Sequence, residues 1–589
     1  MIKKKFYVTT PIYYPNDIPH VGHAYTTIVA DVLARWNRLK GNDVFFLTGT
    51  DDHGKKIAET AKDKGKKPKE FVDGLIPVFK ENWKSLNIDY DKFIRTTDKD
   101  HEKVVQEMLQ KSFDNGDIYK GNYEGLYCVG CEAYYTEKDL EDGRCPIHKK
   151  PVELIKEESY FFKLSKYQDK LLKLYGKNPN FILPKSKKNE IVNRVKEGLR
   201  DLSISRTSFD WGVPLPFDKK HVCYVWFDAL FNYYSGGKKY WPANVHLIGK
   251  DILWFHSVYW PAFLMSVGLD LPKTVFAHGW WTFDKEKISK SRGKVLSVKE
   301  LISIAGVDSA RYFLCRATPF GDDGDFSEKA LIERHNNELA NKLGNLVSRV
   351  SGLIEKFGIE KTPNKFIKKL NEKKIEKLFE NYEFDKVLNE IFAFIDDCNE
   401  YVQSKKIWET KDKKALYELK ESILKIAELL QAFIPESAEK ITKQFSAKNI
   451  KKGEILFKKI EIDEKINKNE KPEGIMTMSE VTFGDWEKLD LRVAQIKKVE
   501  DIEGADKLYK VELDVGKEIG KRIICAGLKE YYSKEDLKGK KIIYFSNLAP
   551  RKMRGIESQG MLLAASTEGH KKVVLIAPEK DIELGSRVG

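Results

Sequence analysis

Residues 6–51 have the sequence FYVTTPIYYPNDIPHVGHAYTTIVADVLARWNRLKGNDVFFLTGTD. Phe6–Val8 is a short run typical of a buried strand, and Asp43–Leu47 is a second one. Between them, apolar spacing predicts an amphipathic helix from Val21 to Lys40, ended by Gly41. Its apolar positions are Tyr25, Ile28, Val29, Val32, Leu33, Trp36 and Leu39. This order predicts an α/β domain with a parallel sheet, whose ligand binds at the carboxyl ends of the strands.

Two histidines stand where the loop enters this helix, in the motif His20-Val21-Gly22-His23. The unpaired backbone N–H groups of a helix N-terminus favour phosphate, and two imidazoles three residues apart extend that set of donors. Gly22 would leave room for a flat group to approach the backbone. Taken alone, the motif is also compatible with two capping or surface histidines.

A second polar motif, Lys287-Ile288-Ser289-Lys290-Ser291, places two lysines and two hydroxyls in one short loop. By itself it is equally compatible with a solvated run of charge. The sequence has no GxGxxG motif and no GxxxxGK[ST] motif that would favour another nucleotide-binding fold.

A cysteine cluster interrupts the α/β pattern between about residues 115 and 215, and two further buried strands are predicted after it, at Tyr224–Phe227 and His246–Gly249. Cys128-Val129-Gly130-Cys131 is followed by Cys145-Pro146-Ile147-His148, which supplies four ligands at zinc spacing. A closed set of four leaves no open position, so we expect one structural Zn²⁺. The remaining cysteines, expected in hydrophobic cores, are Cys223, Cys315, Cys398 and Cys525. Seven cysteines are sparse for this length and indicate a reduced, cytoplasmic protein.

The two polar motifs together resemble the signature pair of class I aminoacyl-tRNA synthetases. The resemblance implies a Rossmann-type catalytic domain with a connective insertion, in which an amino-acid carboxylate attacks the α-phosphate of ATP. It implies that His20 and His23 hold the triphosphate, that Lys287 and Lys290 close over the departing pyrophosphate, and that Mg²⁺ accompanies ATP. The other implied ATP contacts are Gly22, Gly249, Asp251, His278, Gly279, Ser289 and Ser291.

Within this class, the whole chain most resembles the methionyl-tRNA synthetase family. The matching segments are Thr9–Asn16, Thr48–Gly54, Val225–Leu230 and Gly249–His256. The resemblance implies activation of methionine by ATP and transfer to the 3′ end of tRNA(Met). The implied methionine pocket consists of Ile12, Tyr14, Asp51, Trp226, Ala229, Tyr233, Phe255, His256 and Trp260. Aromatic rings suit a thioether and Asp51 can pair with an ammonium group, although each aromatic residue singly is compatible with core packing.

From about residue 330, apolar residues spaced by threes and fours predict helices throughout. This region resembles the family's anticodon-binding bundle, which implies recognition of the CAU anticodon by Asn345, Arg349 and Trp408. Two departures from the family pattern, Ile407 and Gln403, leave the local backbone open, and packing of Trp408 in the bundle core is the alternative.

The last segment has five short alternating strands separated by glycines, which suggest a small barrel. The predicted strands are Leu491–Ile496, Leu508–Val515, Arg522–Ala526, Lys541–Phe545 and Met561–Ala565. The segment resembles the OB-fold tRNA-binding domain that some family members carry. The resemblance implies a homodimer and tRNA contacts, with dimerisation alone as the alternative. The implied tRNA-binding residues are Arg551, Lys552, Arg554 and Ser558.

We therefore expect several domains in the 589 residues. Their expected bounds are 1–115 and 221–330 for the two catalytic halves, 116–220 for the zinc-bearing insertion, 331–465 for the bundle, 466–476 for a linker and 477–589 for the barrel.

The composition agrees with a polyanionic partner. Lys+Arg 103 against Asp+Glu 89 gives a formal charge of +14. The sequence contains no run of 18 apolar residues, so no membrane span is predicted. Its first residues do not have the pattern of a secretory signal. Two alternatives stay open: a tRNA-binding scaffold without catalysis, and another class I synthetase, for leucine or valine. The second would be expected to have a large editing insertion.

Overall fold

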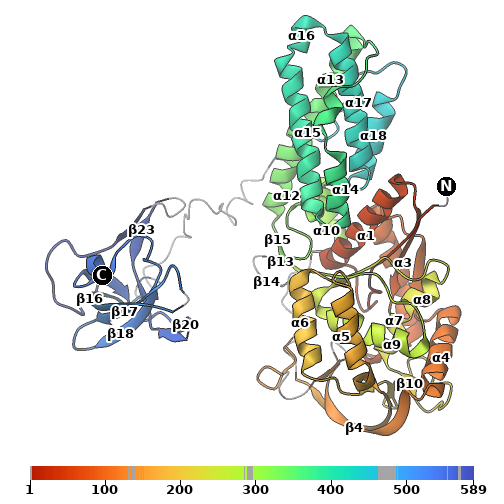
Figure 1. The fold of residues 1–589 in the computed structure, drawn as a ribbon, viewed down its shortest axis with the longest axis horizontal. Helices are drawn as coiled ribbons and strands as arrows, with labels where there is room; N and C mark the ends of the chain where they lie inside the picture. The colour runs from red at the N-terminus through yellow and green to blue at the C-terminus, as the bar shows by residue number, and fades with distance from the viewer. Residues whose placement is uncertain are drawn as a thin grey trace. The chain divides into compact units, whose positions relative to one another are not determined.

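The structure is a computed structural model that describes residues 3–129, 133–135, 140–146, 149, 151–283, 286–287, 296–461, 486, 488–503, 505–553, 555–567 and 572–588. The chain divides into two compact units, Met1–Ile462 and Asp463–Gly589, and each is described by itself. In the first unit, a sheet-containing part and a bundle of long helices share one hydrophobic core (Figure 1). Among the described residues, no helix has both the length and the apolar character needed to cross a membrane.

A six-stranded parallel sheet is the centre of the first unit, with strand order β3-β2-β1-β11-β12-β7. Its strands are β1 (Lys5–Thr9), β2 (Asp43–Thr50), β3 (Lys92–Arg95), β7 (Ile182–Leu183), β11 (Val245–Gly249) and β12 (Val275–His278). β1 pairs with β2 on one edge and with β11 on the other, so the strand order reverses at β1. In doubly wound sheets this reversal is where a ligand crevice forms. The predicted α/β fold is confirmed.

The first helix forms as predicted. α1 (Val21–Leu39) buries Ile28, Val29 and Leu33 in the core, and it ends before Gly41, which has a φ of +78°. Its first N–H group, on Val21, donates to the carbonyl oxygen of Leu296 at 3.0 Å. The chain that follows the Lys287–Ser291 motif therefore returns to the N-terminus of α1.

The prediction of a buried strand at Tyr224–Phe227 is wrong, because Val225–Leu230 forms the helix α7. Every residue of α7 is buried, so apolar residues occur on all its sides and no helical period is visible in the sequence. The strand predicted at His246–Gly249 is confirmed as part of β11. The other helices around the sheet are α2 (Lys55–Asp63), α3 (Pro68–Ser85), α4 (Lys99–Asp114), α8 (Asn232–Gly237), η3 (Lys250–Ile252), η4 (Phe255–Tyr259) and α9 (Trp260–Val267).

A separate antiparallel sheet, with order β5-β4-β6-β8, interrupts the parallel one. Its strands are β4 (Ile118–Cys128), β5 (Ala133–Tyr135), β6 (Glu153–Phe162) and β8 (Leu202–Ser203), and the nearby elements are η2 (Leu164–Tyr167), α5 (Gln168–Lys177), α6 (Lys185–Lys196), β9 (Ser205–Arg206) and β10 (Val222–Cys223). β7 also falls in the range 116–220, yet it pairs with β12 at the edge of the parallel sheet. The chain thus leaves the catalytic sheet and returns to it within that range.

The described part of the chain from β13 to residue 461 is mainly helical. Its elements are β13 (Trp281–Phe283), β14 (Glu286–Lys287), β15 (Gly324–Phe326), α10 (Val298–Ala305), α11 (Val307–Arg316), α12 (Glu328–Arg334), η6 (His335–Gly344), α13 (Asn345–Phe357), η7 (Phe366–Lys369), α14 (Glu372–Glu380), α15 (Phe384–Ser404), α16 (Ile407–Thr410), α17 (Lys413–Leu430) and α18 (Pro435–Phe445). Arg311, fully buried on α11, joins the bundle to α1. Its guanidinium lies 2.6 Å from Asp31 Oδ2, and it donates to the carbonyl oxygens of Ala432 and Phe433 at 3.0 and 2.9 Å.

The second unit contains a five-stranded antiparallel sheet with order β18-β17-β16-β19-β22. Its elements are β16 (Leu491–Asp501), β17 (Tyr509–Asp514), β18 (Lys521–Ala526), α21 (Lys534–Leu537), β19 (Lys541–Phe545), β20 (Arg551–Met553), β21 (Ile556–Ser558), β22 (Met561–Leu562), β23 (Ala564–Ser566) and β24 (Val573–Leu575). The N–H of Gln559 donates to the carbonyl of Ile523 on β18 at 2.8 Å, which brings the first and last strands of the sheet together. The predicted small barrel of five strands is confirmed.

Candidate active site

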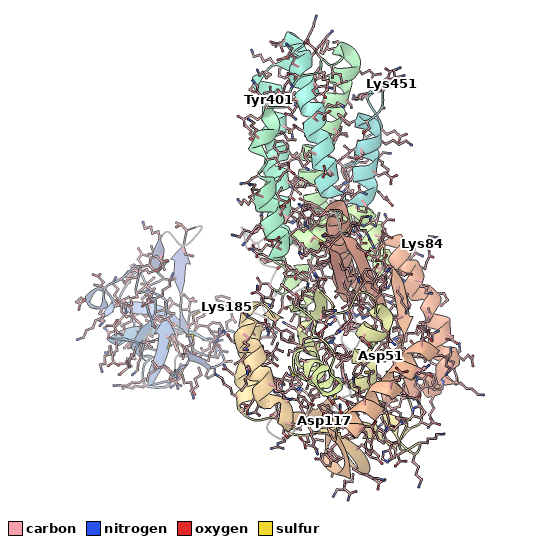
Figure 2. All side chains as sticks on the ribbon, turned by 45° about the vertical axis from the view of Figure 1, so that its right-hand side comes forward. Asp51, Lys84, Asp117, Lys185, Tyr401 and Lys451 are labelled. Carbon is pink, nitrogen blue, oxygen red and sulfur yellow. The ribbon has the colours of Figure 1, made fainter. Side chains whose placement is uncertain are left out.

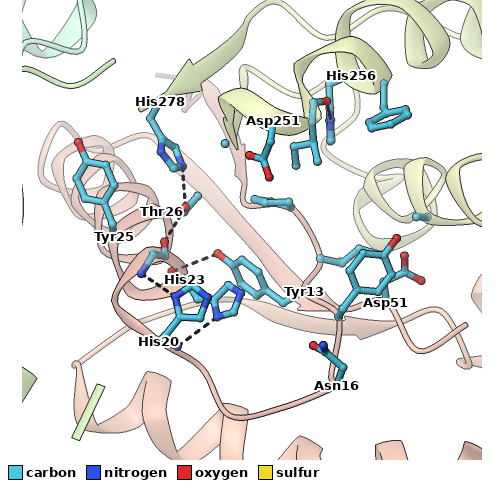
Figure 3. A pocket seen from close by; sticks show the side chains of 18 of the residues that line it. Tyr13, Asn16, His20, His23, Tyr25, Thr26, Asp51, Asp251, His256 and His278 are labelled. Atoms are coloured by element: carbon cyan, nitrogen blue, oxygen red, sulfur yellow. Dashed lines mark hydrogen bonds between the residues drawn. The ribbon is translucent and has the colours of Figure 1, made fainter. Parts of the chain in front are cut away.

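A cavity of about 470 Å³ opens at the carboxyl ends of β1, β2, β11 and β12, beside the N-terminus of α1. Figure 3 shows His20 and His23 on one side of it and Asp51 on the other. Its volume is in the range of small-molecule sites. The lining residues that the sequence predicted are Ile12, Tyr14, His20, Gly22, His23, Asp51, Trp226, Ala229, Tyr233, Gly249, Asp251, Phe255, His256, His278 and Gly279.

His20 and His23 form a reciprocal cap at the start of α1. The N–H of Gly22 donates to His20 Nδ1 at 3.1 Å, and the N–H of His20 donates to His23 Nδ1 at 3.3 Å. A neutral imidazole whose Nδ1 accepts must carry its proton on Nε2. Both rings therefore offer an Nε2–H donor in addition to the donors of the helix N-terminus.

Gly22 lines the cavity, and the absence of a side chain there also serves its own motif. A Cβ atom at this position would lie 2.9 Å from His20 Cε1 and 3.2 Å from His20 Nδ1. The glycine therefore makes room for the ring of its own motif, and the ring then caps the helix.

Two lining residues near these histidines were not predicted from the sequence. Tyr13 packs its ring 4.9 Å from that of His23 and donates to Thr27 Oγ1, 2.8 Å away. Thr26 Oγ1 lies 2.7 Å from His278 Nε2. Since Nδ1 of His278 donates to the carbonyl of Gly279 at 2.7 Å, Nε2 accepts from Thr26, and burial lowers the pKa of this histidine. The one-turn spacing of Thr26 from Gly22 is the signal that would have placed it here.

Aromatic side chains form the other end of the cavity. Trp226 and Phe255 stack with ring centroids 3.8 Å apart. Tyr233 donates to His256 Nε2 at 2.7 Å, because His256 Nδ1 donates to the carbonyl of Ile252 at 2.9 Å. Burial lowers the pKa of His256 to about 4, so its ring is neutral. This end of the cavity is mainly apolar, and the hydroxyl of Tyr233 is held in place by its hydrogen bond to His256.

Trp260 was predicted in the pocket but is not among the residues that line the cavity. It is fully buried behind Tyr233, with ring centroids 6.0 Å apart. Its Nε1–H donates to His246 Nε2 at 3.2 Å, and the pKa of His246 is well below its usual value because of burial. Trp260 therefore supports the wall from behind.

Asp51 brings a buried carboxylate to the cavity wall. It follows β2, is 3% exposed and lines the cavity, and Thr96 Oγ1 lies 3.4 Å from its Oδ1. Its N–H donates to the carbonyl of Tyr13 at 2.9 Å. A buried carboxylate beside an aromatic pocket is suited to an ammonium group.

Asp251 and Trp280 form the third side of the cavity. Trp280 Nε1 donates to Asp251 Oδ1 at 3.2 Å, and the N–H of Trp280 donates to Asp323 Oδ1 at 2.7 Å. Trp280 directly follows His278 and Gly279 in the sequence and lines the cavity together with them. A side chain at Gly279 would lie 2.2 Å from the Asp322 carbonyl oxygen, so this position requires glycine.

The predicted loop with two lysines lies mostly outside the described residues. Lys287 is the last residue of β14, and Ser289, Lys290 and Ser291 are not described. The described residue Ser297 forms a bridge with His20. The first signature motif is thus bridged to the described chain that follows the second one.

Two of the four predicted zinc ligands are described. Cys128 ends β4, and both Cys128 and Cys145 are buried. Cys131 and His148 lie outside the described residues. Of the other cysteines, Cys223, Cys315 and Cys398 are buried as expected, whereas Cys525 is partly exposed.

A different group of potential ligands, Glu158, Asp218 and His221, comes together in the described part of the insertion. Lys120 Nζ lies 2.8 Å from Glu158 Oε1 and 3.4 Å from Asp218 Oδ2. An ammonium group therefore already pairs with both carboxylates, and we assign no metal to them.

The predicted anticodon residues lie on the surface of the bundle. Asn345 and Arg349 are exposed on α13. Trp408 is 42% exposed on α16, which lies at the end of the bundle far from the sheet (Figure 1), whereas its neighbour Ile407 is fully buried. Packing of Trp408 in the bundle core is therefore excluded. Figure 2 likewise shows Tyr401 of the same region far from Asp51.

The predicted tRNA-binding residues of the barrel have different environments. Arg551 and Lys552 are exposed on β20, and Arg554 is not described. Ser558 is 4% exposed, and its hydroxyl accepts from the N–H of Cys525 at 3.0 Å. Ser558 therefore connects β21 to β18, and we leave it out of any RNA-contacting surface.

Comparisons with known proteins agree with this arrangement. The family model described as tRNA synthetases class I (M) matches residues 6–151 and 136–351. The model for the anticodon-binding domain of tRNA ligase matches residues 364–517, and a putative tRNA binding domain matches residues 491–587.

Curated relatives match over the full length. The methionine–tRNA ligase of Caldanaerobacter subterraneus subsp. tengcongensis is 46% identical, with 100% of both chains covered. That of Thermotoga maritima is 43% identical, covering 99% of this chain and 100% of the relative. A solved structure, Mycobacterium tuberculosis methionyl-tRNA synthetase in complex with methionyl-adenylate, has a TM-score of 0.72 and 41% identity, and covers 75% of this chain and 94% of that one. The chain belongs to the methionine–tRNA ligase family of class I tRNA synthetases.

Proposed function

We propose that this chain joins methionine to tRNA(Met) in two steps at the cavity described above. In the first, a carboxylate oxygen of methionine bonds to the α-phosphorus of ATP, and the bond to the bridging oxygen breaks, releasing pyrophosphate. In the second, a hydroxyl of the terminal tRNA ribose attacks the carbonyl carbon of methionyl-adenylate, and AMP leaves. One observation carries the proposal: a single cavity has imidazole donors at one end and an aromatic pocket with Asp51 at the other.

The phosphate end works by positioning and charge stabilisation. The Nε2–H groups of His20 and His23 donate to the phosphate oxygens together with the N-terminus of α1. Lys287 and Lys290, with Ser289 and Ser291, take up charge on the departing pyrophosphate. Mg²⁺ bound with ATP neutralises part of the triphosphate charge. Gly249 and Asp251 would contact the ribose, and His278 and Gly279 the adenine.

The amino-acid end selects methionine by shape and polarizability. Asp51 pairs with the ammonium group, and the stacked rings of Trp226 and Phe255 contact the thioether, at about 0.3–1.5 kcal/mol per sulfur–aromatic contact. His256 is held neutral, so its Nε2 accepts from Tyr233 and presents no charge to the pocket. Ile12, Tyr14 and Ala229 complete the apolar surface.

A zinc ion bound by Cys128, Cys131, Cys145 and His148 is part of the proposal. The two described sulfur atoms are buried although residues Glu141–Arg144, directly before Cys145, are exposed. Buried thiols within a polar surface segment fit ligation better than core packing. Four ligands close the coordination sphere, so the ion would stabilise the insertion and take no part in catalysis.

tRNA recognition is divided between the two units. Trp408, exposed at the end of the bundle, is suited to stacking on an unpaired base, and Asn345 and Arg349 to hydrogen bonds with base edges. In the barrel, Arg551 and Lys552, with Arg554, would contact phosphates. We further propose that the barrel forms the homodimer and that the protein acts in the cytoplasm, where its thiols stay reduced.

ATP–pyrophosphate exchange, measured with each of the twenty amino acids, tests the proposal. Exchange with methionine alone is expected. Exchange with leucine or valine instead would identify another class I specificity. No exchange with any amino acid, with tRNA binding retained, would identify a tRNA-binding scaffold.

A further inference from the structure

A buried carboxylate lies behind the proposed methionine pocket and is not part of its lining. Asp228 is 1% exposed, and its two oxygens bind two buried histidines from different elements. His53 Nδ1 lies 2.7 Å from Asp228 Oδ2, and His101 Nε2 lies 2.8 Å from Asp228 Oδ1. None of the three is among the residues that line the cavity.

Asp228 and His53 belong to two different walls of the pocket. Asp228 is on α7, whose residues Trp226 and Ala229 line the cavity. His53 comes two residues after Asp51, the proposed partner of the ammonium group. The ion pair between His53 and Asp228 therefore connects the wall that contacts the thioether to the wall that contacts the ammonium group.

Another connection reaches α8, which provides Tyr233 to the cavity. His101 Nδ1 lies 2.7 Å from Ser235 Oγ, and Ser235 is on α8. His101 Nε2 donates to Asp228, so the ring of His101 joins this carboxylate to the hydroxyl of Ser235. Asp228, itself on α7, is thus connected by hydrogen bonds to the segment after β2 through His53 and to α8 through His101.

The charges of His53 and Asp228 strengthen the hydrogen bond between them. Burial lowers the pKa of His53, but attraction to Asp228, and to Asp52 and Glu102, outweighs burial and leaves this pKa raised. Burial raises the pKa of Asp228, but the two histidines outweigh it and leave this pKa lowered. Hydrogen bonds between charged partners are shorter and stronger than neutral ones.

We propose that Asp228 is a positioning residue for amino-acid recognition: through His53 and His101 it holds Asp51, α7 and α8 at the spacing that methionine requires. The inference rests on the proposed function. When the spacing between the walls of the pocket relaxes, a substrate that touches several walls loses part of each contact. The phosphate end of the cavity is built on α1, a different element. We therefore expect ATP binding to be insensitive to changes at Asp228.

The test is ATP–pyrophosphate exchange by the full-length protein with Asp228→Asn, which removes the charge and keeps the shape. We expect the KM for methionine to rise about tenfold or more and the KM for ATP to change less than about threefold. A purely structural defect lowers the active fraction, and hence kcat, without changing either KM. Asp308→Asn is the matched control, since Asp308 is also buried but accepts from the N–H of Ser437 at 2.7 Å, within the bundle.

Histidine variants test the same connection without touching the carboxylate. His53→Asn keeps a donor near the position of Nδ1, and His101→Gln keeps one near the position of Nε2. We expect both to stay closer to the wild-type methionine KM than His53→Ala and His101→Ala, which remove the donors.

The inference is overturned if Asp228→Asn and His53→Ala both keep a methionine KM within about threefold of wild type. If Asp228→Asn does not fold, the two His53 variants decide alone. Absence of methionine-dependent exchange in the wild type would instead overturn the proposed function itself.

Discussion

His20 and His23 stack with their ring centroids 3.9 Å apart, and each ring accepts a backbone N–H of the turn that holds them both. The motif therefore first fixes the start of α1 and then presents its Nε2–H donors. The glycine between the histidines is what permits the first of these rings to take its place.

Gly22→Ala should displace the His20 ring, because the new Cβ would lie 2.9 Å from Cε1. We expect methionine-dependent exchange to fall by about 10²-fold, the usual cost of one misplaced donor, with a raised KM for ATP. Gly74→Ala on α3 is the matched control, since a Cβ there meets nothing within 4 Å. Equal activity of the two variants would contradict this role of Gly22.

Lys290→Ala should lower methionine activation by about two decades or more while methionine affinity changes little, because Lys290 is proposed to act on the departing pyrophosphate. Exchange kinetics and equilibrium methionine binding together measure this. An exchange rate within about threefold of wild type would show that the assignment is wrong.

Freshly purified protein should contain about one zinc per chain by elemental analysis, since one complete four-ligand set is predicted. Cys128→Ser should lose the metal and destabilise the insertion, detected as faster proteolysis between β4 and β6. Cys223→Ser is the control, because Cys223 is also buried but is on β10 and is not one of the four proposed ligands. A wild-type protein without zinc would overturn the proposal.

His256 should make the fold sensitive to acid. Its pKa is about 4 in the folded protein and about 6.5 when unfolded, so between these values the unfolded state binds the extra proton and stability falls as the pH falls. From pH 7 to pH 5 the loss is about 2 kcal/mol.

Urea unfolding of two variants isolates this contribution. His256→Asn should show a weaker loss, whereas Tyr233→Phe removes the same hydrogen bond but keeps the titrating ring and should keep the loss. The other histidines are present in all three proteins, so their contributions to the pH dependence of stability cancel when the proteins are compared. Identical pH dependence of all three would contradict the assignment.

Deleting residues 477–589 should leave methionine-dependent exchange intact, because the proposed activation residues all lie in the first unit. The KM for tRNA should rise, and the penalty should shrink at high salt because phosphate contacts release counterions. Sedimentation should show a monomer if the barrel forms the dimer.

Loss of the dimer would also remove a second linked tRNA-binding surface. The double change Arg551→Glu and Lys552→Glu in an intact dimer separates the two effects. A wild-type KM for tRNA across the salt range in that variant would leave assembly as the role of the barrel.

Local sequence patterns predicted the elements that repeat a clear period. The helix at Val21–Lys40 repeats apolar positions at a helical spacing, the five barrel strands alternate apolar and polar positions, and both are present. The period disappears where an element is buried on all sides, and there the prediction of a strand at Tyr224–Phe227 failed. Two-residue β7 is too short for any pattern to reveal it.

The residues that line the cavity were predictable where they belong to sequence motifs. They were not predictable where tertiary packing determines which side chain reaches the cavity. Trp260 and Phe255 are both buried aromatic residues in similar sequence surroundings, yet only Phe255 lines the cavity. Likewise, nothing in the order of residues shows that His53, His101 and Asp228, from three distant segments, meet. Such contacts depend on the tertiary arrangement of the elements.

The buried Arg311 side chain limits which parts of this protein can be exchanged with those of a relative. Its donors end on main-chain oxygens of Ala432 and Phe433, so a grafted bundle must reproduce backbone geometry at the corner between α17 and α18. A chimera that fails to do so leaves a buried guanidinium short of acceptors, at a cost of about 1–3 kcal/mol for each unmet donor. The barrel has its own hydrophobic core. In the descent of such enzymes, the barrel can therefore be gained or lost as a separate domain, whereas the bundle and the helix that begins at Val21 must be inherited together.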